Sequence, residues 1–402
     1  MKLFKSLLVA PATLGLLAPM AATANEVTIS DFNPAEEIAV TNSRVDGLEA
    51  RLNNFEAGGF SETTTASFGV DMIVGAVDSD DATTSEATTF DYQMGIGLST
   101  SFTGEDSLDL TIETGNASSP SGTILDMNSM SDTMTLDGIT YTFPLGESGT
   151  VMVGDSTDVS ALYSTACVYS AFTDRLGDCG SGNAAGLGGG TADQDSTSTS
   201  DDASSATIAA SYDFGNGFTV AGGMSSAGGD SDGLFTKQSL DVYGLQAAYN
   251  ADNYGISVSY ALTEGQHTVT EHPDDGYDTT YWGLNGFYSF DDAKLPSISV
   301  GYETEDKDTS YSHSGYAGTA YAAHEKSGFF AGLTWEEVGP GSLSVGLSSV
   351  TNYKDSETEY YQYEAAYTYP INDGMTITPG AFIKETSGDD ETGLIVKTSF
   401  SF

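Results

Sequence analysis

The sequence predicts an all-β membrane fold, an antiparallel transmembrane β-barrel of about sixteen strands, preceded by a short N-terminal coiled-coil helix. Three observations predict it. From Ser61 onward apolar residues recur with a period of two, as in YQYEAAYTYPIN from Tyr361 to Asn372, which is the period of a strand. Short turns alternate strictly with long acidic loops, and the chain ends on a strand that finishes with Phe402.

The composition excludes several classes of protein. The 402 residues include 58 Asp and Glu but only 12 Lys and Arg, and the formal net charge is −46. Nucleic acid and anionic membrane surfaces repel such a chain, so no nucleic-acid partner is expected. High acidity can indicate disorder, but 22 Tyr, 19 Phe and 47 Gly are typical of strands in which aromatic residues alternate with small ones.

Residues 1–24 have the pattern of a secretory signal peptide. Two lysines precede an apolar run that two prolines interrupt, and Ala22-Thr23-Ala24 is a small-residue cleavage site. The alternative is an uncleaved membrane anchor, which the prolines and the short apolar core disfavour. No later segment holds eighteen consecutive apolar residues, so a secreted, periplasmic or barrel protein is expected rather than a helical membrane protein.

Residues 35–57 predict a short coiled-coil helix within a periplasmic segment, residues 25–59. The repeats RVDGLE and RLNNFE resemble the Arg-hydrophobic-x-x-hydrophobic-Glu pattern of three-stranded parallel coiled coils, in which g and e′ positions pair. A single amphipathic helix on its own domain is the alternative, because the heptads are few and Gly47 weakens the helix. The residues expected to trimerise are Arg44, Val45, Leu48, Glu49, Arg51, Leu52, Phe55 and Glu56.

The segment 60–402 carries the strands, and its connections are of two kinds. Short turns are expected at residues 104–105, 146–147, 215–217, 250–252, 291–295, 338–341 and 372–374. Long acidic loops are expected near residues 78–88, 115–137, 156–206, 223–238, 263–278, 304–326, 351–358 and 385–392. By this count, the first strand begins and the last strand ends on the short-turn side, as is typical of a closed barrel. Closure leaves no unpaired edge in lipid. Half of each strand is polar, which indicates a wide aqueous lumen.

The C-terminal segment LIVKTSFSF predicts the strand that closes the barrel. Val396, Thr398, Phe400 and Phe402 share one face of an extended chain, while lysine and serines occupy the other. A chain end frays unless it is paired in a sheet. We therefore expect Phe400 and Phe402 to act as the signal that the barrel-assembly machinery recognises.

Cys167 and Cys179 are the two cysteines of the chain. In a secreted protein, a disulfide within this loop is the natural interpretation. Free thiols are the alternative. A metal site is not expected, because no His lies nearby.

Four segments together resemble the outer-membrane porins of cyanobacteria, especially the marine unicellular kind: MKLFKSLLVAPATLGLLAPMAATANE, RVDGLEARLNNFEAGGFSETTTASFGV, TACVYSAFTDRLGDCG and the SFSF terminus. The resemblance implies a homotrimeric general diffusion porin in the cell outer membrane, with a periplasmic coiled-coil stalk. It passes ions and small hydrophilic solutes, carbohydrates among them. Family members usually carry a surface-layer-homology segment between signal and stalk. Here only Asn25 to Pro34 stand in that place, which leaves peptidoglycan attachment open.

The resemblance also implies that the third long loop, residues 156–206, folds into the lumen and sets its narrowest point. Arg175, Asp174 and Asp178, with Tyr169 and Phe172, lie between the cysteines. Because charge at a constriction sets ion preference, one arginine facing several acids predicts a pore that favours cations or neutral solutes. The alternative is that Arg175 only pairs with a neighbouring Asp on an exposed loop.

Enzyme chemistry and cofactors are not expected. No G-x-S-x-G or comparable nucleophile arrangement is present, and the histidines have no metal-ligand spacing: His267, His272, His313 and His324. Two other functions remain open. One is a substrate-selective channel of the same architecture, for sugar, phosphate or an iron complex. The other is a structural or adhesive outer-membrane protein whose lumen is plugged.

Overall fold

A computed structural model of the chain describes residues 64–79, 87–177, 179–182, 184, 205–227, 233–234, 236, 240–264, 278–292, 294–307, 324–350 and 358–402. The predicted signal peptide, the predicted helix 35–57 with its trimerisation residues, and Asp178 lie outside the described residues. Thr63–Phe402 form one compact unit.

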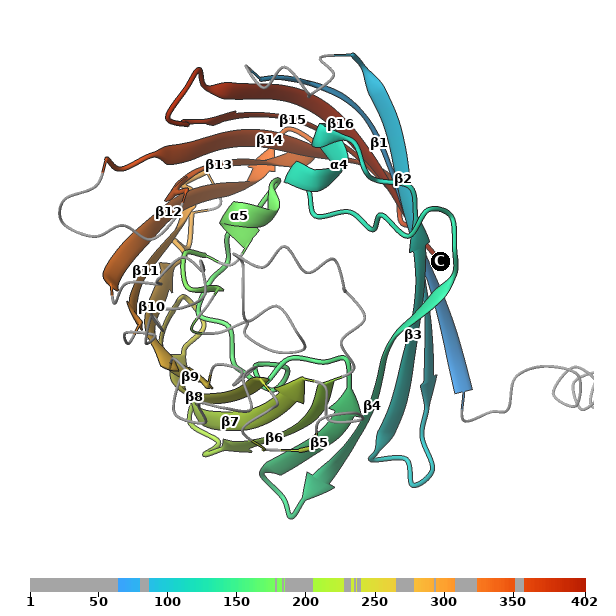
Figure 1. Cartoon of the computed structure of the whole chain (residues 1–402), viewed down its shortest axis with the longest axis vertical. Helices are drawn as coiled ribbons and strands as arrows, with labels where there is room; N and C mark the ends of the chain where they lie inside the picture. The colour runs from blue at the N-terminus through green and yellow to red at the C-terminus, as the bar shows by residue number, and fades with distance from the viewer. Residues whose placement is uncertain are drawn as a thin grey trace, which may run out of the picture. The chain divides into compact units, whose positions relative to one another are not determined.

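Sixteen strands in this unit close into a single antiparallel barrel (Figure 1). Each strand pairs with its neighbours in sequence, and β1 pairs with β16. The strands are β1 Thr64–Asp78, β2 Thr89–Thr100, β3 Ser107–Gly115, β4 Thr135–Leu145, β5 Gly149–Asp155, β6 Ser205–Asp213, β7 Phe218–Ala227, β8 Leu240–Asn250, β9 Tyr254–Glu264, β10 Asp278–Tyr288, β11 Ser297–Lys307, β12 His324–Val338, β13 Gly341–Ser349, β14 Tyr361–Asn372, β15 Met375–Lys384 and β16 Glu391–Ser401. The predicted strand number and closure are confirmed.

The seam between β1 and β16 shows why the sequence period leads to closure. Gly69 pairs with Ser401, and the register continues without a shift to Asp78 opposite Thr392. Val396, Thr398 and Phe400 therefore lie on one face of β16, as predicted. Because every neighbour is hydrogen-bonded, the barrel has no free edge, which is the condition for a sheet in lipid.

Short turns and long loops alternate as the sequence predicts, but two loops begin later than expected. The loop expected from residue 304 begins only after Lys307, where β11 ends. The loop expected from residue 223 begins only after Ala227, because β7 continues through a stretch of small residues. Glycines and serines suggested a loop, but Ser225 is fully covered and its Oγ lies 2.9 Å from Thr207 Oγ1 of β6. Small residues here keep the inner wall flat rather than ending the strand.

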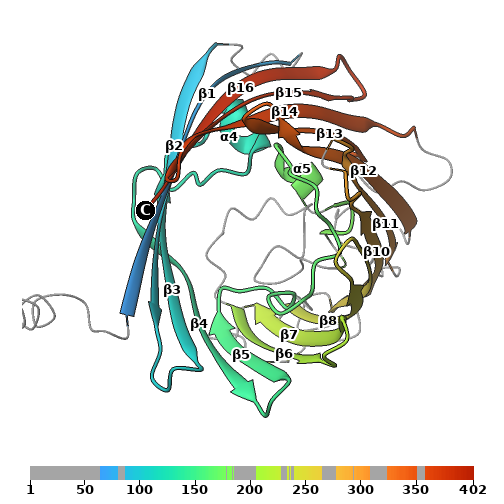
Figure 2. The same cartoon turned by 180° about the vertical axis from the view of Figure 1, so that it is seen from behind.

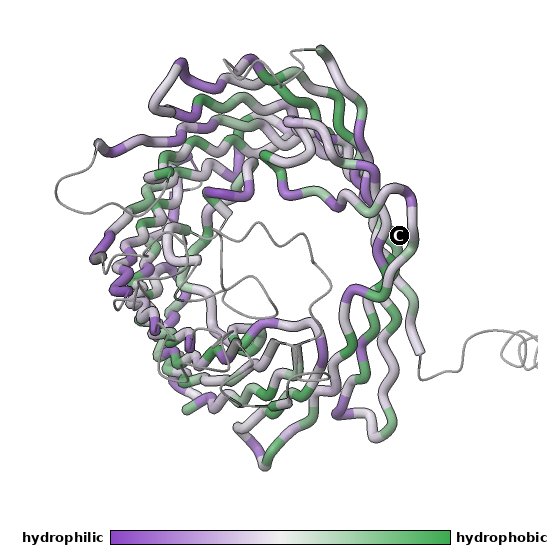
Figure 3. The backbone as a smooth tube through the Cα atoms, in the orientation of Figure 1, coloured by the Kyte–Doolittle hydropathy of each residue, from purple (hydrophilic) through white to green (hydrophobic). Residues whose placement is uncertain are grey.

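The outer face of the barrel is apolar. Figure 3 shows hydrophobic and hydrophilic residues alternating along the strands, and the exposed members of the alternation are large apolar side chains. They include Met72, Val74, Val153, Ile208, Met224, Leu245, Ile256, Val258, Leu284, Val300, Val345, Ile383, Leu394 and Val396. The positions between them carry serine, threonine, glutamine and glutamate and face inward. This alternation is the pattern of a barrel wall with lipid outside and a polar interior.

Exposed aromatic side chains gather at both ends of the wall. Near the short turns lie Phe68, Phe214, Phe218, Tyr254, Tyr288, Phe290, Tyr369 and Phe402. Near the long loops lie Phe90, Trp282, Tyr302, Phe329 and Tyr363. Two such belts are typical of membrane barrels, in which aromatic rings lie at the level of the lipid headgroups.

Two short helices interrupt the long loops. The helix α4, Pro120–Ile124, lies in loop 2 (residues 116–134), and α5, Asp174–Gly177, lies in loop 3 (residues 156–204). Ser119 caps α4, since the Gly122 N–H donates to its Oγ at 3.2 Å, and Pro120 supplies a favourable first residue. Within the described part of the chain, no helix has both the length and the apolar character needed to cross a membrane.

Candidate functional site: the loop-lined lumen

Loop 3 runs along the inner wall of the barrel. Figures 1 and 2 view the ring from opposite sides, and both place the described part of loop 3 inside it, with α5 beside β12 to β14. Backbone N–H groups of the loop donate to wall side chains as it passes: Ser164 to Gln246 Oε1 of β8 at 2.8 Å, Val168 to Ser299 Oγ of β11 at 3.1 Å, and Ser170 to Thr334 Oγ1 of β12 at 3.1 Å. Inward-facing polar side chains thus satisfy the loop's backbone donors.

One wall carboxylate, Glu364 of β14, receives four donors from loop 3. Its Oε1 accepts the Tyr169 hydroxyl at 2.8 Å and the Phe172 N–H at 2.8 Å. Its Oε2 accepts the Thr173 N–H at 2.8 Å and the Thr173 hydroxyl. Glu364 is 3% exposed, so water has little access to its carboxylate. These four hydrogen bonds take the place of hydration for the buried charge. Burial and the nearby Glu364 charge raise the pKa of Tyr169, which keeps its hydroxyl a donor.

Glycines on the inner wall make room for loop 3. A Cβ at any of these positions would collide with the loop: at Gly301 with the Cys179 carbonyl oxygen, at Gly332 and Gly346 with the Tyr169 ring, and at Gly380 with the Phe172 ring. Gly244 likewise makes room for Tyr163, and Gly283 makes room for Ser181 and Ala184. The loop packs closely because the wall has no side chain at these glycine positions.

Cys167 and Cys179 form the predicted disulfide, with their Cα atoms 6.5 Å apart. Beyond it, the Cys179 carbonyl accepts a hydrogen bond from Asn285 Nδ2 of β10 at 2.8 Å, and the Ala184 N–H donates to Glu303 Oε2 of β11 at 2.7 Å. The bridge joins two parts of loop 3 to each other. The attachment to the barrel comes from wall side chains.

The residues predicted for the constriction divide into two groups. Tyr169 and Phe172 point to the wall: Tyr169 packs edge-on against Phe330 with ring centroids 5.1 Å apart, and Phe172 is 4% exposed. The Arg175 Nε donates to the Ser349 carbonyl of β13 at 2.9 Å, so this side chain also reaches the wall. Asp174 is exposed on α5, and Asp178 lies outside the described residues.

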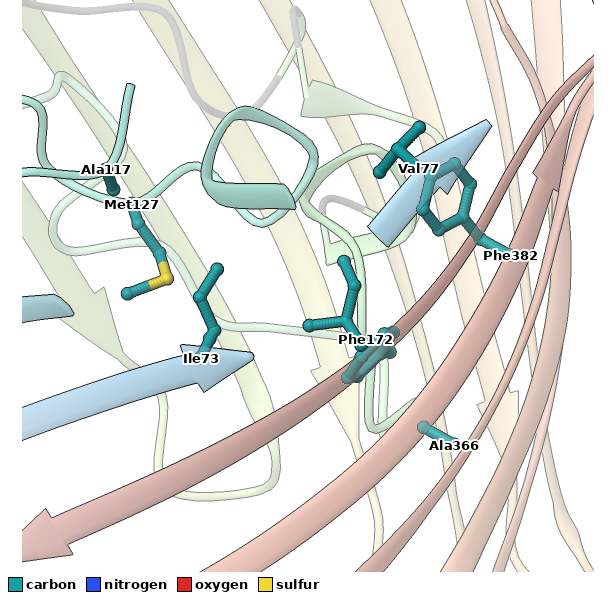
Figure 4. Close-up of a cluster of buried hydrophobic side chains, with 8 residues drawn as sticks. Ile73, Val77, Ala117, Met127, Phe172, Ala366 and Phe382 are labelled. Carbon is teal, nitrogen blue, oxygen red and sulfur yellow. The ribbon is translucent and has the colours of Figure 1, made fainter. Parts of the chain in front are cut away.

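Loop 2 also folds against the inner wall, beside β1 and β16. Its Ala117 and Met127 join Ile73 and Val77 of β1, Ala366 of β14, Phe382 of β15, Ile395 of β16 and Phe172 of loop 3 in one buried apolar cluster (Figure 4). Polar contacts fix its ends, since the Asn128 N–H donates to Gln93 Oε1 of β2 at 3.0 Å. Two loops from different places in the chain therefore meet on one side of the lumen.

The inner face of β3 and its neighbours carries a different surface. Asp109 and Glu113 point inward from β3, and neither is buried. Elsewhere on the inner wall, described lysines pair with acids: Lys326 Nζ lies 4.0 Å from Glu305 Oε1, and Lys384 Nζ lies 3.1 Å from Glu391 Oε2. The described inner wall thus holds carboxylates on β3 and paired charges on β11, β12, β15 and β16.

Sequence reasoning missed Glu364 and the inward packing of loop 2. Glu364 falls on the polar face of β14 like any lumen residue, and nearly two hundred residues separate it from its partners in loop 3. For loop 2, the sequence SSPSG from Ser118 to Gly122 holds a capping serine followed by proline, which could have indicated α4.

No protein-family model matches the sequence, and a comparison with curated protein sequences finds no match. The structure is similar to several solved ones. Pseudomonas putida OprB aligns with a TM-score of 0.58 and 10% identity over 85% of this chain and 94% of that chain. An anion-selective porin from Comamonas acidovorans aligns with a TM-score of 0.57 and 13% identity over 85% and 99%. OmpT of Vibrio cholerae, an outer membrane protein described in its trimer form, aligns with a TM-score of 0.53 and 10% identity over 85% and 100%.

The chain thus has the sixteen-stranded fold of bacterial outer-membrane porins. With its apolar exterior and two aromatic belts, the barrel belongs in the outer membrane, the location that the sequence predicted.

Proposed function

We propose that the protein is an outer-membrane porin through which ions and small hydrophilic solutes diffuse passively. The observation that carries the proposal is a closed barrel whose polar inner wall holds loop 3 to one side by hydrogen bonds to β8, β11, β12 and β14. A sixteen-stranded barrel is wide enough to leave an aqueous path beside such a loop. The identities to solved porins are low, so the proposal rests on the lumen and not on the likeness.

We also propose a preference for cations. Asp109 and Glu113 on the wall and Asp174 on α5 place negative charge along the path, and fixed charge of one sign at close quarters selects the opposite ion. Lys326 and Lys384 are paired with glutamates, while Lys397 lies on the inner face of the seam, opposite Ile73. The Comamonas acidovorans neighbour is called anion-selective. The fold therefore does not fix whether cations or anions are preferred, and we attribute the preference proposed here to these side chains.

The homotrimer remains part of the proposal. The RVDGLE and RLNNFE repeats of the predicted helix support it, as does the trimer form of the Vibrio cholerae neighbour. Cross-linking of the purified full chain followed by mass measurement tests the stoichiometry. Substitution of Leu48 and Leu52 by Asp is expected to abolish the cross-linked trimer if the helix carries it, because charge at heptad core positions opposes association.

The functional test is electrical recording from the purified protein in planar bilayers. We expect discrete conductance steps and a reversal potential of cation-selective sign under a potassium chloride gradient. Glu113→Gln and Asp174→Asn should each move that potential toward zero, and comparing them shows whether the wall or loop 3 sets selectivity. Absence of conductance would favour the plugged, structural alternative, and an anion-selective sign would refute the cation preference.

Solute size and type are tested by liposome swelling. A general diffusion pore admits neutral solutes in order of size, whereas a selective channel favours one chemical class. Inward-facing aromatic side chains of the wall, Tyr281, Phe330 and Phe382, are each less than 10% exposed beneath the loops. These three are not placed to stack on a passing sugar. Phe287 of β10, opposite Ser299, also faces inward and is partly exposed.

A further inference from the structure

We propose that Glu364 is the positioning residue that sets the aperture of the pore, because it holds residues 169–173 of loop 3 at one fixed place on the barrel wall. This inference rests on the proposed porin function. It concerns a side chain of β14 that lies outside loop 3 and far from it in sequence.

The geometry uses the full capacity of a carboxylate. Each oxygen of Glu364 accepts two donors, one from the backbone and one from a side chain of loop 3. An ionised carboxylate only accepts hydrogen bonds, whereas a glutamine amide presents one acceptor and one pair of donors. In a Glu364→Gln variant, either orientation of the amide would turn its N–H groups against a backbone N–H of the loop.

A neighbouring side chain orients one of these donors. Gln362, the preceding inward position of β14, donates from Nε2 to Thr173 Oγ1 at 2.7 Å. The Thr173 hydroxyl therefore accepts from Gln362 and donates to Glu364. Gln362, Thr173 and Glu364 are all at most 3% exposed, so water does not compete for these bonds.

The other contacts of this segment constrain its position less than the four bonds to Glu364 do. Beneath it the wall is flat at Gly332, Gly346 and Gly380, and the apolar contacts of Phe172 are non-directional. The disulfide joins loop 3 to itself, since both cysteines belong to the loop. Of the hydrogen bonds that attach residues 169–173 to the wall, four go to Glu364, one joins the Ser170 N–H to Thr334 Oγ1, and one joins Gln362 Nε2 to Thr173 Oγ1. Glu364 therefore carries most of this directional attachment.

The position of this segment decides how far the loop reaches into the lumen. Helix α5 begins at Asp174, the residue after Thr173, so holding Thr173 places α5 and its exposed carboxylate. Loss of the bonds to Glu364 would leave α5 held by the Arg175 bond to Ser349 and by buried Leu176, and we expect the start of α5, and with it the narrowest cross-section, to shift.

The decisive variant is Glu364→Gln, recorded as the full-length protein in planar bilayers. We expect loss of the single wild-type conductance level, with larger and noisier open-channel currents. Glu391→Gln is the matched control, because this acid also faces inward, at the mouth of the barrel on β16, and it pairs with Lys384 and not with loop 3. Wild-type conductance and noise in a folded Glu364→Gln barrel would overturn the proposal.

A loop-side variant keeps the test decisive if Glu364→Gln fails to fold. Tyr169→Phe combined with Thr173→Val removes two donors and leaves β14 unchanged, and the same shift in conductance level is expected. Tyr169→Phe alone should give a smaller shift. Unaltered currents in a folded double variant would count against Glu364.

Amide hydrogen exchange separates this inference from the porin proposal. Faster exchange at Phe172 and Thr173 in Glu364→Gln, and not in Glu391→Gln, is expected whether or not the wild-type protein conducts. A wild type without conductance would refute the porin function, and unchanged exchange at both amides would refute the role of Glu364.

Discussion

Phe402 and Phe68 close the barrel at its short-turn end. The Phe402 N–H donates to the Phe68 carbonyl at 3.0 Å, and the Phe68 N–H donates to the Phe402 carbonyl at 2.8 Å. Their rings stack with centroids 5.6 Å apart at an interplanar angle of 15°. The last residue of the chain is thereby paired instead of frayed, and it joins the first strand to the last on the lipid-facing side.

Substitution of this ring should weaken the seam. Phe402→Ala removes the stacked pair and is expected to cost about 1 kcal/mol of unfolding free energy, and deletion of Phe402 should cost more because both backbone bonds are lost. Urea unfolding of the barrel in lipid vesicles, followed by circular dichroism, measures this. Phe90→Ala is the control, an exposed ring of β2 at the long-loop end of the wall. Equal losses in the two variants would contradict a special role for the seam.

Removal of the disulfide should separate stability from pore geometry. With the cysteines 12 positions apart in sequence, the Cys167→Ser, Cys179→Ser variant is expected to lose about 3 kcal/mol of unfolding free energy through the freer unfolded chain. Its single-channel conductance should stay close to wild type, because Glu364 still holds residues 169–173. A changed conductance with unaltered urea midpoint would show that the bridge shapes the pore directly.

A methyl group on the inner wall should displace loop 3. Gly346→Ala would bring its Cβ to 2.5 Å from the Tyr169 hydroxyl oxygen and 2.7 Å from its ring, and overpacking of this kind costs about 1–3 kcal/mol. We expect a lower urea midpoint together with altered conductance. Gly69→Ala is the control, since it lies on the inner face of β1 with nothing within 4 Å of the added Cβ.

The β2–β3 turn should give a pH-dependent contribution to stability. Asp106 accepts from the Thr103 N–H at 2.7 Å, from the Phe102 N–H at 2.9 Å and from the Tyr141 hydroxyl at 2.7 Å. Hydrogen bonds, that from the Thr103 backbone first, hold the pKa of Asp106 well below its usual range, although burial opposes them. Because the folded pKa is lowered, this stabilisation is present above about pH 4, the ordinary Asp value, and is lost as pH falls toward the folded pKa.

The measurement compares wild type with Asp106→Asn across pH. At neutral pH the variant should unfold at lower urea, and the gap should narrow as pH falls below about 4. Glu105→Gln, an exposed carboxylate in the same turn, should show no such gap. A gap that is constant with pH would mean that the charge of Asp106 is not what stabilises the turn.

Much of the barrel was predictable because its signals are local. The alternation in β14 and β15 defines both faces of each strand, and Asn372-Asp373-Gly374 marks the turn between them. The start of the loop after β7 was misplaced, because Gly222, Gly223, Ser225 and Ser226 have the composition of a loop. They lie in β7, where Gly223 faces loop 3 and a Cβ would come to 2.8 Å from the Val159 carbonyl oxygen.

The candidate site was predictable only in part. The cysteine pair follows from its context, but Tyr169 and Phe172 face the wall, where they bind Glu364 and the apolar cluster. Neither Glu364 nor the apolar cluster can be inferred from the sequence near residue 170. The aromatic residues of β14, Tyr361, Tyr363, Tyr367 and Tyr369, lie on its outer face, so they form part of the lipid-facing surface and not of the path.

The sequence by itself determined the wall: the number of strands, their antiparallel order, and which residues share a face. Those properties depend on the two-residue period and on turn chemistry, which act between neighbours in the chain. Only the tertiary structure decided what occupies the interior, namely that loop 3 binds to Glu364 and that loop 2 packs beside Ile73 and Phe382. These contacts join residues that come together only after the barrel has closed, so no local pattern encodes them.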